Sequence, residues 1–289
     1  MTFRFNTPLN LSLTVSFLAL ALTACGGGGD GGSDPGPGTP PPVAPPVTPP
    51  GSTTPTTGLT TDGSVSAPFV RGTRSQGIFL NVPYAAFGRL DALTQSPEGA
   101  VTALDDNSLA LPGTVRDIQG DASFAMGRWT AGIANIWVPS TPTVTLTEAG
   151  SDAFHYVTFN RPERLPTTGT LTCGLVAFTP PSYGGGSSVS SGDFRGQITG
   201  TATMSFSSMG AAVGLTLNIT TPSSSISKSV STTISAPDSM PDLRDPGSNA
   251  DVVFVGLGTD GASYDVVGGY VLGLASGARY AGVIRFRCV

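Results

Sequence analysis

The chain has 289 residues, of which only 11% are charged, and its formal net charge at pH 7 is −5. Lys228 is the only lysine, so no cluster of lysines is available for phosphate groups, and these properties argue against a nucleic-acid partner. Neutral Ser, Thr and Gly residues alternate with apolar ones over most of the length, which is typical of one large all-β domain.

Residues 1–24 have the three parts of a bacterial secretory signal: a weakly positive start, an apolar stretch over residues 9–22, and small residues at the end. The tetrad Leu22-Thr23-Ala24-Cys25 has the form of a lipobox, in which the cysteine becomes the acylated N-terminus. The alternative is a transmembrane helix. It is disfavoured because polar residues interrupt the stretch, which is shorter than the ~20 apolar residues that a span needs.

Cys25 is therefore the predicted lipidation site, carrying several acyl chains such as palmitate, which hold a protein firmly on a membrane. Gly26 follows it, whereas in similar lipoproteins Asp at this position favours retention in the inner membrane. We predict a lipid-anchored protein of the bacterial outer membrane. The exposure of its body at the cell surface is left open.

Residues 25–58 form the predicted tether, because the run of four glycines after Cys25 and the proline-rich stretch over residues 40–50 hold almost no residue that builds a core. A tether of this composition is disordered, with extended polyproline character in its proline part. It lifts a folded domain off the membrane surface.

Two cysteines remain after Cys25, and an oxidising compartment outside the cytoplasm favours their pairing. Cys173 and Cys288 lie on segments whose apolar faces both include the cysteine. We predict a Cys173–Cys288 disulfide, with two unpaired buried thiols as the alternative.

Strict period-two alternation dominates from residue 122 onward. Residues 193–206 place Phe194, Ile198 and Met204 on one face and a row of polar residues on the other, and residues 213–219 continue the pattern as the second strand of a long hairpin. The further predicted strands are 77–82, 122–136, 154–159, 170–178, 225–235, 264–274 and 279–288, and a short turn is expected over 85–93.

Glycines at inward positions and consecutive hairpins favour a single closed antiparallel β-barrel of about eight strands over residues 121–289, with a β-sandwich as the runner-up. Residues 59–120 are expected to supply N-terminal strands and loops that pack on this barrel. A membrane-spanning barrel is disfavoured, because a chain tethered by lipid has no need to insert and glycine at apolar positions suits a packed interior.

Glycine-spaced and aromatic segments recur along the predicted barrel: residues 194–202 and 268–273, then Ala278, Tyr280 and Gly282, and also 127–129, 155–157 and 165–170. These segments resemble the C-terminal barrel domain of transferrin-binding protein B and related surface lipoproteins. The similarity covers roughly residues 122–289, although Leu274 and Arg279 stand where the family usually has proline and an acidic residue. The resemblance implies a barrel that recognises a protein or an iron-related ligand.

No catalytic set is recognised, so we do not expect an enzyme. His155 is the only histidine and lies among aromatic residues of a strand, which favours a structural role. Ser225 and Lys228 match a Ser-x-x-Lys motif, but residues three apart on a strand point to opposite faces, so Lys228 is expected at the barrel mouth instead.

No cofactor, metal ligand set or dinucleotide fingerprint is recognised. Asp105-Asp106-Asn107 is more typical of a turn than of a calcium loop. The predicted function is a surface binding module that acts through barrel loops, for which residues 139–149, 178–191 and 236–251 are the candidates. The alternatives are an envelope structural lipoprotein without a specific ligand and, distantly, a hydrolase.

Overall fold

The computed structural model of the chain describes residues 56–137, 142–148, 151–244 and 251–289. The predicted signal, Cys25 and the tether up to residue 55 lie outside the described residues. The described part is nearly all β, with strands β1 to β18, the short 3₁₀ helix η1 (Ser191–Asp193) and no α-helix. Within these ranges, no helix is long and apolar enough to cross a membrane.

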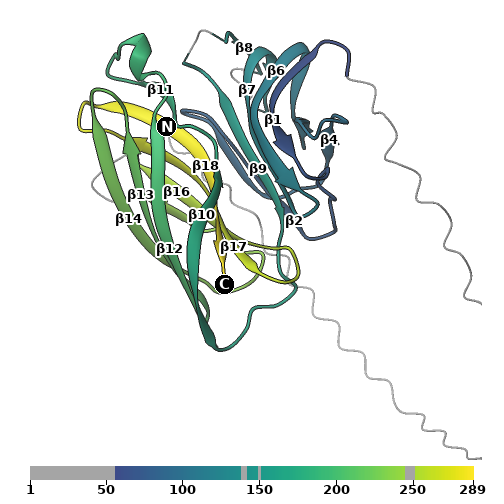
Figure 1. Cartoon of the computed structure of the whole chain (residues 1–289), viewed down its shortest axis with the longest axis vertical. Helices are drawn as coiled ribbons and strands as arrows, with labels where there is room; N and C mark the ends of the chain where they lie inside the picture. The colour runs from purple at the N-terminus through teal and green to yellow at the C-terminus, as the bar shows by residue number, and fades with distance from the viewer. Residues whose placement is uncertain (1–55, 138–141, 149–150, 245–250) are drawn as a thin grey trace, which may run out of the picture. The chain divides into compact units, whose positions relative to one another are not determined.

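The N-terminal half of the body forms a curled sheet of nine strands, drawn in purple to teal in Figure 1. Its strand order is β3-β2-β9-β7-β6-β5-β4, with β1 added parallel to β6 and β8 added to β7. Its own core centres on buried aromatic side chains, among them Trp129 and Phe154. The strands are β1 (Leu59–Val65), β2 (Ser75–Leu80), β3 (Ala85–Arg89), β4 (Leu93–Gln95), β5 (Val101–Leu104), β6 (Asn107–Asp121), β7 (Phe124–Asn135), β8 (Thr143–Leu146) and β9 (Phe154–Asn160).

The C-terminal half curls into a nearly closed antiparallel barrel with the strand order β14-β13-β12-β10-β18-β17-β16-β15, drawn in green to yellow in Figure 1. The predicted barrel is thus confirmed, and its interior holds the inward residues of every long strand. β11 pairs with β18 beside this path. The strands are β10 (Gly169–Phe178), β11 (Ser182–Gly186), β12 (Gln197–Ser207), β13 (Gly210–Thr220), β14 (Ser225–Ile234), β15 (Asp242–Arg244), β16 (Val252–Thr259), β17 (Tyr264–Gly273) and β18 (Ala278–Cys288).

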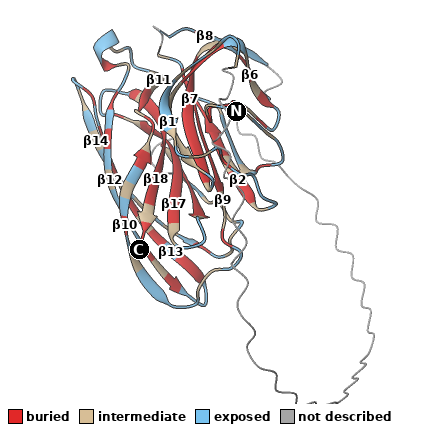
Figure 2. Cartoon of the chain, turned by 45° about the vertical axis from the view of Figure 1, so that its right-hand side comes forward, coloured by how far each residue is buried: buried red, intermediate tan, exposed pale blue. Residues whose placement is uncertain are grey.

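A third apolar cluster joins the curled sheet to the outer surface of the barrel. It combines Ile78, Met126 and Phe159 of the sheet with Phe254 and Val283 of the barrel. Strands β16 to β18 are therefore buried on both faces, which explains their nearly continuous apolar sequence. Figure 2 shows this buried interior in red, whereas β14 at the barrel edge carries mostly pale exposed residues.

The boundary between the two parts differs from the expected one at residue 120. Strands β7, β8 and β9 pair within the curled sheet, so the barrel begins at β10 with Gly169. The N-terminal region is a complete sheet with its own core, and residues 85–89 form β3 where a turn was expected. Period-two alternation identifies a strand and its two faces, but it carries no information about which strand lies beside it.

Tyrosine rings cover glycines at matching places in both parts. Tyr270 of β17 pairs directly with Gly282 of β18, and Tyr156 of β9 pairs directly with Gly127 of β7. A Cβ atom at either glycine would clash with the opposite tyrosine side chain. Glycine is therefore required at these inward positions, because it leaves room for a large ring across the strand pair.

The predicted disulfide is present. Cys173 of β10 and Cys288 of β18 lie directly opposite each other with their Cα atoms 4.0 Å apart, and their sulfur atoms are bonded. Both side chains belong to the barrel core. The bridge joins the first strand of the barrel to its last one, across a sequence separation of 115 residues.

Candidate functional site

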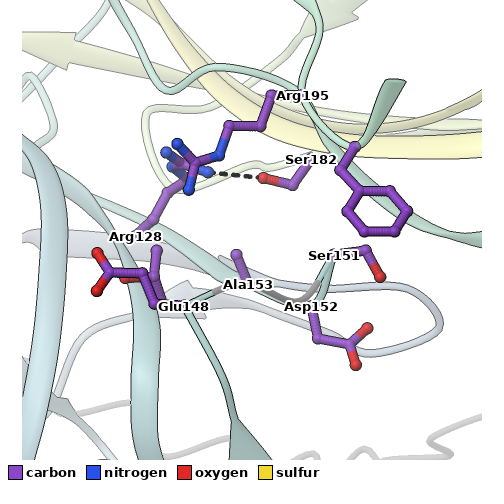
Figure 3. Close-up of a pocket in the computed structure, with 9 residues that line it drawn as sticks. Arg128, Glu148, Ser151, Asp152, Ala153, Ser182 and Arg195 are labelled. Atoms are coloured by element: carbon purple, nitrogen blue, oxygen red, sulfur yellow. Dashed lines mark hydrogen bonds between the residues drawn. The ribbon is translucent and has the colours of Figure 1, made fainter. Parts of the chain in front are cut away.

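A polar pocket lies where the curled sheet meets the barrel, and Figure 3 shows the side chains around it. Its enclosed volume is only about 10 Å³, which is room for about one water molecule. Pockets for whole small molecules begin at ~300 Å³, so a ligand could place no more than the end of one polar group in it. The polar residues that line it are Arg128, Thr130, Glu148, Asp152, Ser182 and Arg195.

Arg128, in the middle of β7, forms the floor of the pocket and is 2% exposed. Its Nε donates to Asp117 Oδ2 at 2.6 Å, and its Nη1 donates to Ser182 Oγ of β11 at 2.9 Å. Burial lowers the pKa of Arg128 from its usual value, while Asp117 acts in the opposite direction. The guanidinium thus links the curled sheet to the barrel in one fixed orientation.

Asp117 is positioned for this role by an irregularity in β6. Its backbone has a φ of 54°, an unusual conformation that Asp tolerates better than most residues, and the β6–β7 register shifts at this point. Its N–H donates to Asp62 Oδ1 at 2.6 Å. The shift turns the Asp117 carboxylate toward Arg128.

Arg116, the next residue of β6, belongs to a separate ion-pair group. Its Nε donates to Glu148 Oε1 at 2.7 Å, and its Nη1 donates to Asp62 Oδ2 at 2.8 Å. The hydrogen bonds to Glu148 and then Asp62 raise the pKa of Arg116. Glu148, on one wall of the pocket, is therefore neutralised in part by Arg116.

Arg195 enters the pocket from the barrel side, just before β12, and its side chain is exposed. Figure 3 shows its guanidinium beside that of Arg128. The two positive charges repel, and Arg195 adds to the lowering of the pKa of Arg128. Among the described residues, Arg195 has no side-chain hydrogen bond or ion pair.

Two hydroxyl groups complete the polar lining. Ser182, 4% exposed, accepts the bond from Arg128, and its own proton has no acceptor within the described part of the chain. Thr130, 3% exposed, lies two residues after Arg128 on β7, and its buried Oγ1 has no hydrogen-bond partner among the described residues. Buried hydroxyl groups are normally satisfied, so these two donors lack the acceptor that is usual for buried groups.

His155 of β9 lies next to this region but is completely buried. Its Nδ1 is 2.7 Å from Thr179 Oγ1, which also accepts the Val283 N–H at 3.1 Å. Burial, and then the charge of Arg128, lower the pKa of His155 well below its ordinary value. The ring is neutral near pH 7, and it joins the two parts of the body without access to solvent.

Ser225 and Lys228 lie on strand β14, as the alternation indicates, so the Ser-x-x-Lys spacing has no helical geometry. Lys228 lies on the inward face of β14, between Ile226 and Val230. Its Nζ lies 3.2 Å from Asp251 Oδ2 at the barrel end where β16 begins. This is the position that was expected for it.

Asp105, proposed as part of a turn, has a φ of 48° and accepts the N–H groups of Asp91 and Ala92 at 2.7 and 2.8 Å. It thereby closes the connection between neighbouring strands. In the described ranges, no three His, Cys, Asp or Glu side chains are grouped as a metal site requires.

Two of the three candidate loops contribute to the pocket. Glu148 comes from the loop at 139–149, and Ser182 comes from the loop at 178–191. The described residues of the third loop, 236–244 and Asp251, do not line it. Residues 138–141, 149–150 and 245–250 of these regions lie outside the described residues.

Arg128, Thr130 and Arg195 lie in predicted strands, and the two arginines also lie in segments that carry the family resemblance, but none of the three was predicted to be a site residue. A signal for Arg128 was nevertheless present, because it is a lone charge in a strand that is otherwise apolar and small. No protein-family model matches the chain, and no curated protein shows significant sequence similarity to it.

Proposed function

We propose that this protein is a lipid-anchored envelope protein whose β body is a binding module. The pocket at the junction of the curled sheet and the barrel is the recognition site. The observation that carries the proposal is the unpaired guanidinium of Arg195, held beside the buried Arg128 in a pocket that offers two unused hydroxyl donors. Unused donors on a rigid β framework are a feature of recognition sites.

The anchor part of the proposal rests on the lipobox at Cys25 and on the glycine- and proline-rich segment after it. The Cys173–Cys288 disulfide supports it, because such bonds persist in oxidising compartments outside the cytoplasm. Acyl chains on Cys25 would hold the protein in the outer membrane, with the body displayed on its tether.

The partner that we propose is a protein, because the pocket is far too small to enclose a whole small molecule and could contact only a polar group presented by a larger partner. The resemblance of the barrel strands to the transferrin-binding protein B barrel supports recognition of a protein, including one that carries iron. The alternative is a structural role in the envelope without a ligand, and the experiment must distinguish this role from binding.

The test is photo-crosslinking of the full-length protein in intact cells that produce it. A photoreactive residue at Ser151, in the pocket wall, is compared with one at Ser229, on the exposed outer face of β14. We expect a discrete adduct from position 151 only, and its loss when Arg195→Gln is added. Equal labelling from both positions, or none from position 151, would contradict a binding role and favour the structural one.

A further inference from the structure

The geometry points to a carboxylate site: Arg195, with the hydroxyl groups of Ser182 and Thr130, binds one carboxylate group of a ligand above the buried guanidinium of Arg128. This inference rests on the proposed binding function and names the chemical group that the pocket recognises.

Three donors of the pocket are unused. Arg128 is paired with Asp117 and Ser182, and Arg116 is paired with Asp62 and Glu148. The donors that remain are the Arg195 guanidinium, the Ser182 proton and the Thr130 hydroxyl, and Asp152 also lines the pocket as an acceptor without an ion pair among the described residues. A ligand that satisfies the three donors must supply acceptor oxygens.

The guanidinium groups of Arg128 and Arg195 also repel each other, so nearby negative charge stabilises them. Arg128 has Asp117 as its counter-ion, whereas Arg195 has none within the described part of the chain. An anion between the pocket wall and Arg195 would relieve the repulsion from Arg128. A guanidinium matches a carboxylate especially well, because its two parallel N–H groups meet the two carboxylate oxygens.

The surrounding charges favour a monoanion over a phosphate dianion. Glu148 and Asp152 both line the pocket, and Asp152 has no ion pair among the described residues. Two carboxylates at the rim would repel a second negative charge on the ligand.

The experiment follows the Arg195 side-chain Nε–H signal of the full-length protein by NMR while three probes are added at constant ionic strength. The probes are a capped peptide with one Glu, free acetate and inorganic phosphate, and the same peptide with Gln in place of Glu is the control. We expect a saturable shift with the Glu peptide and none with the Gln peptide. Tighter binding of acetate than of the Glu peptide would identify a free monocarboxylate as the source of the group.

Matched variants connect the shift to the pocket. Arg195→Gln should weaken binding at least about tenfold, and Thr130→Val should weaken it about fivefold, as expected for losing a charged and a neutral hydrogen bond respectively. Arg89→Gln, which removes an arginine paired with Asp91 on the surface, should change nothing. Because Arg195→Gln lacks the Arg195 signal, binding to the variants is measured through the Nε–H signal of Arg128, a second group of the pocket.

Several outcomes would overturn the inference: no saturable shift with any carboxylate, equal binding of the Gln peptide, or tighter binding of phosphate. Each of these results can be distinguished from a failure of the proposed function. The crosslinking experiment detects a partner whatever group it presents, whereas the titration detects carboxylate binding without any partner.

Discussion

Lys228 and Asp251 form an ion pair across the seam of the barrel, with Nζ 3.2 Å from Oδ2. Lys228 lies on β14, at one end of the strand order, and Asp251 directly precedes β16, next to the other end at β15. Asp251 Oδ1 also accepts the Gly273 N–H at 2.8 Å. The only lysine of the chain thus connects the two sides of the opening. An inward-pointing charge on an edge strand also disfavours pairing with another molecule.

Replacing Lys228 by Met should lower the free energy of unfolding by about 3 kcal/mol, because Asp251 stays nearly buried without this cation. Urea denaturation of the purified protein measures the change. Arg244→Gln is the control, since its ion pair with Asp242 is exposed and should contribute less than about 1 kcal/mol. Equal losses in the two variants would show that the ion pair does not stabilise the seam.

The two tyrosines that cover glycines should respond oppositely to loss of the hydroxyl group. Tyr270 Oη is buried without a partner among the described residues, so Tyr270→Phe should leave the stability unchanged or raise it by about 1 kcal/mol. Tyr156 Oη accepts the Val101 N–H at 3.2 Å, so Tyr156→Phe should lower the stability by about 1 kcal/mol. Denaturant midpoints of both variants, measured together, test the difference. A larger loss for Tyr270→Phe would contradict the assignment.

The stability should decrease in mild acid because of His155. Its folded-state pKa lies well below the ordinary 6.5, so below that pH the unfolded chain binds a proton that the folded chain does not. The free energy of unfolding should therefore fall as the pH is lowered from about 7 to 5.5, by at most about 1.4 kcal/mol per pH unit.

His155→Gln isolates this contribution, because glutamine does not titrate. Whatever its effect on the overall stability, the variant should show a flatter pH dependence over the same interval. A slope equal to that of the unchanged protein would mean that His155 does not control the acid sensitivity.

The disulfide should make a large contribution, because it closes a long loop between the first and last strands of the barrel. Replacing Cys173 and Cys288 by Ala together should lower the free energy of unfolding by about 5 kcal/mol in the chain-entropy description. Reductant should weaken the unchanged protein and leave the double variant unaffected. A reductant effect that persists in the double variant would point to another cause.

The strands and the disulfide were predictable because each follows from a local pattern. Alternation fixes the two faces of β12 over residues 197–206, whereas the predicted strand began at residue 193, where the structure has the end of η1. Both cysteines lie on apolar faces. The division into two sheets was not predictable. The pairing of β7 with β6 and β9 depends on contacts between distant residues.

The pocket was only partly predictable, for the same reason. Two loops that contribute to it were identified from their length and composition. Arg128 and Thr130 come from a strand of the curled sheet and meet Arg195 only because the barrel packs against that sheet. Whether a charged residue has a partner is a property of the folded arrangement, and the sequence does not contain it directly.

We propose that a lipid on Cys25 anchors this body in the bacterial envelope, and mass spectrometry of the mature N-terminal peptide examines that anchor itself. We predict that the mature chain begins at Cys25 and carries the added mass of several acyl chains. An N-terminus at another residue, or an unmodified Cys25, would rule out the lipid anchor.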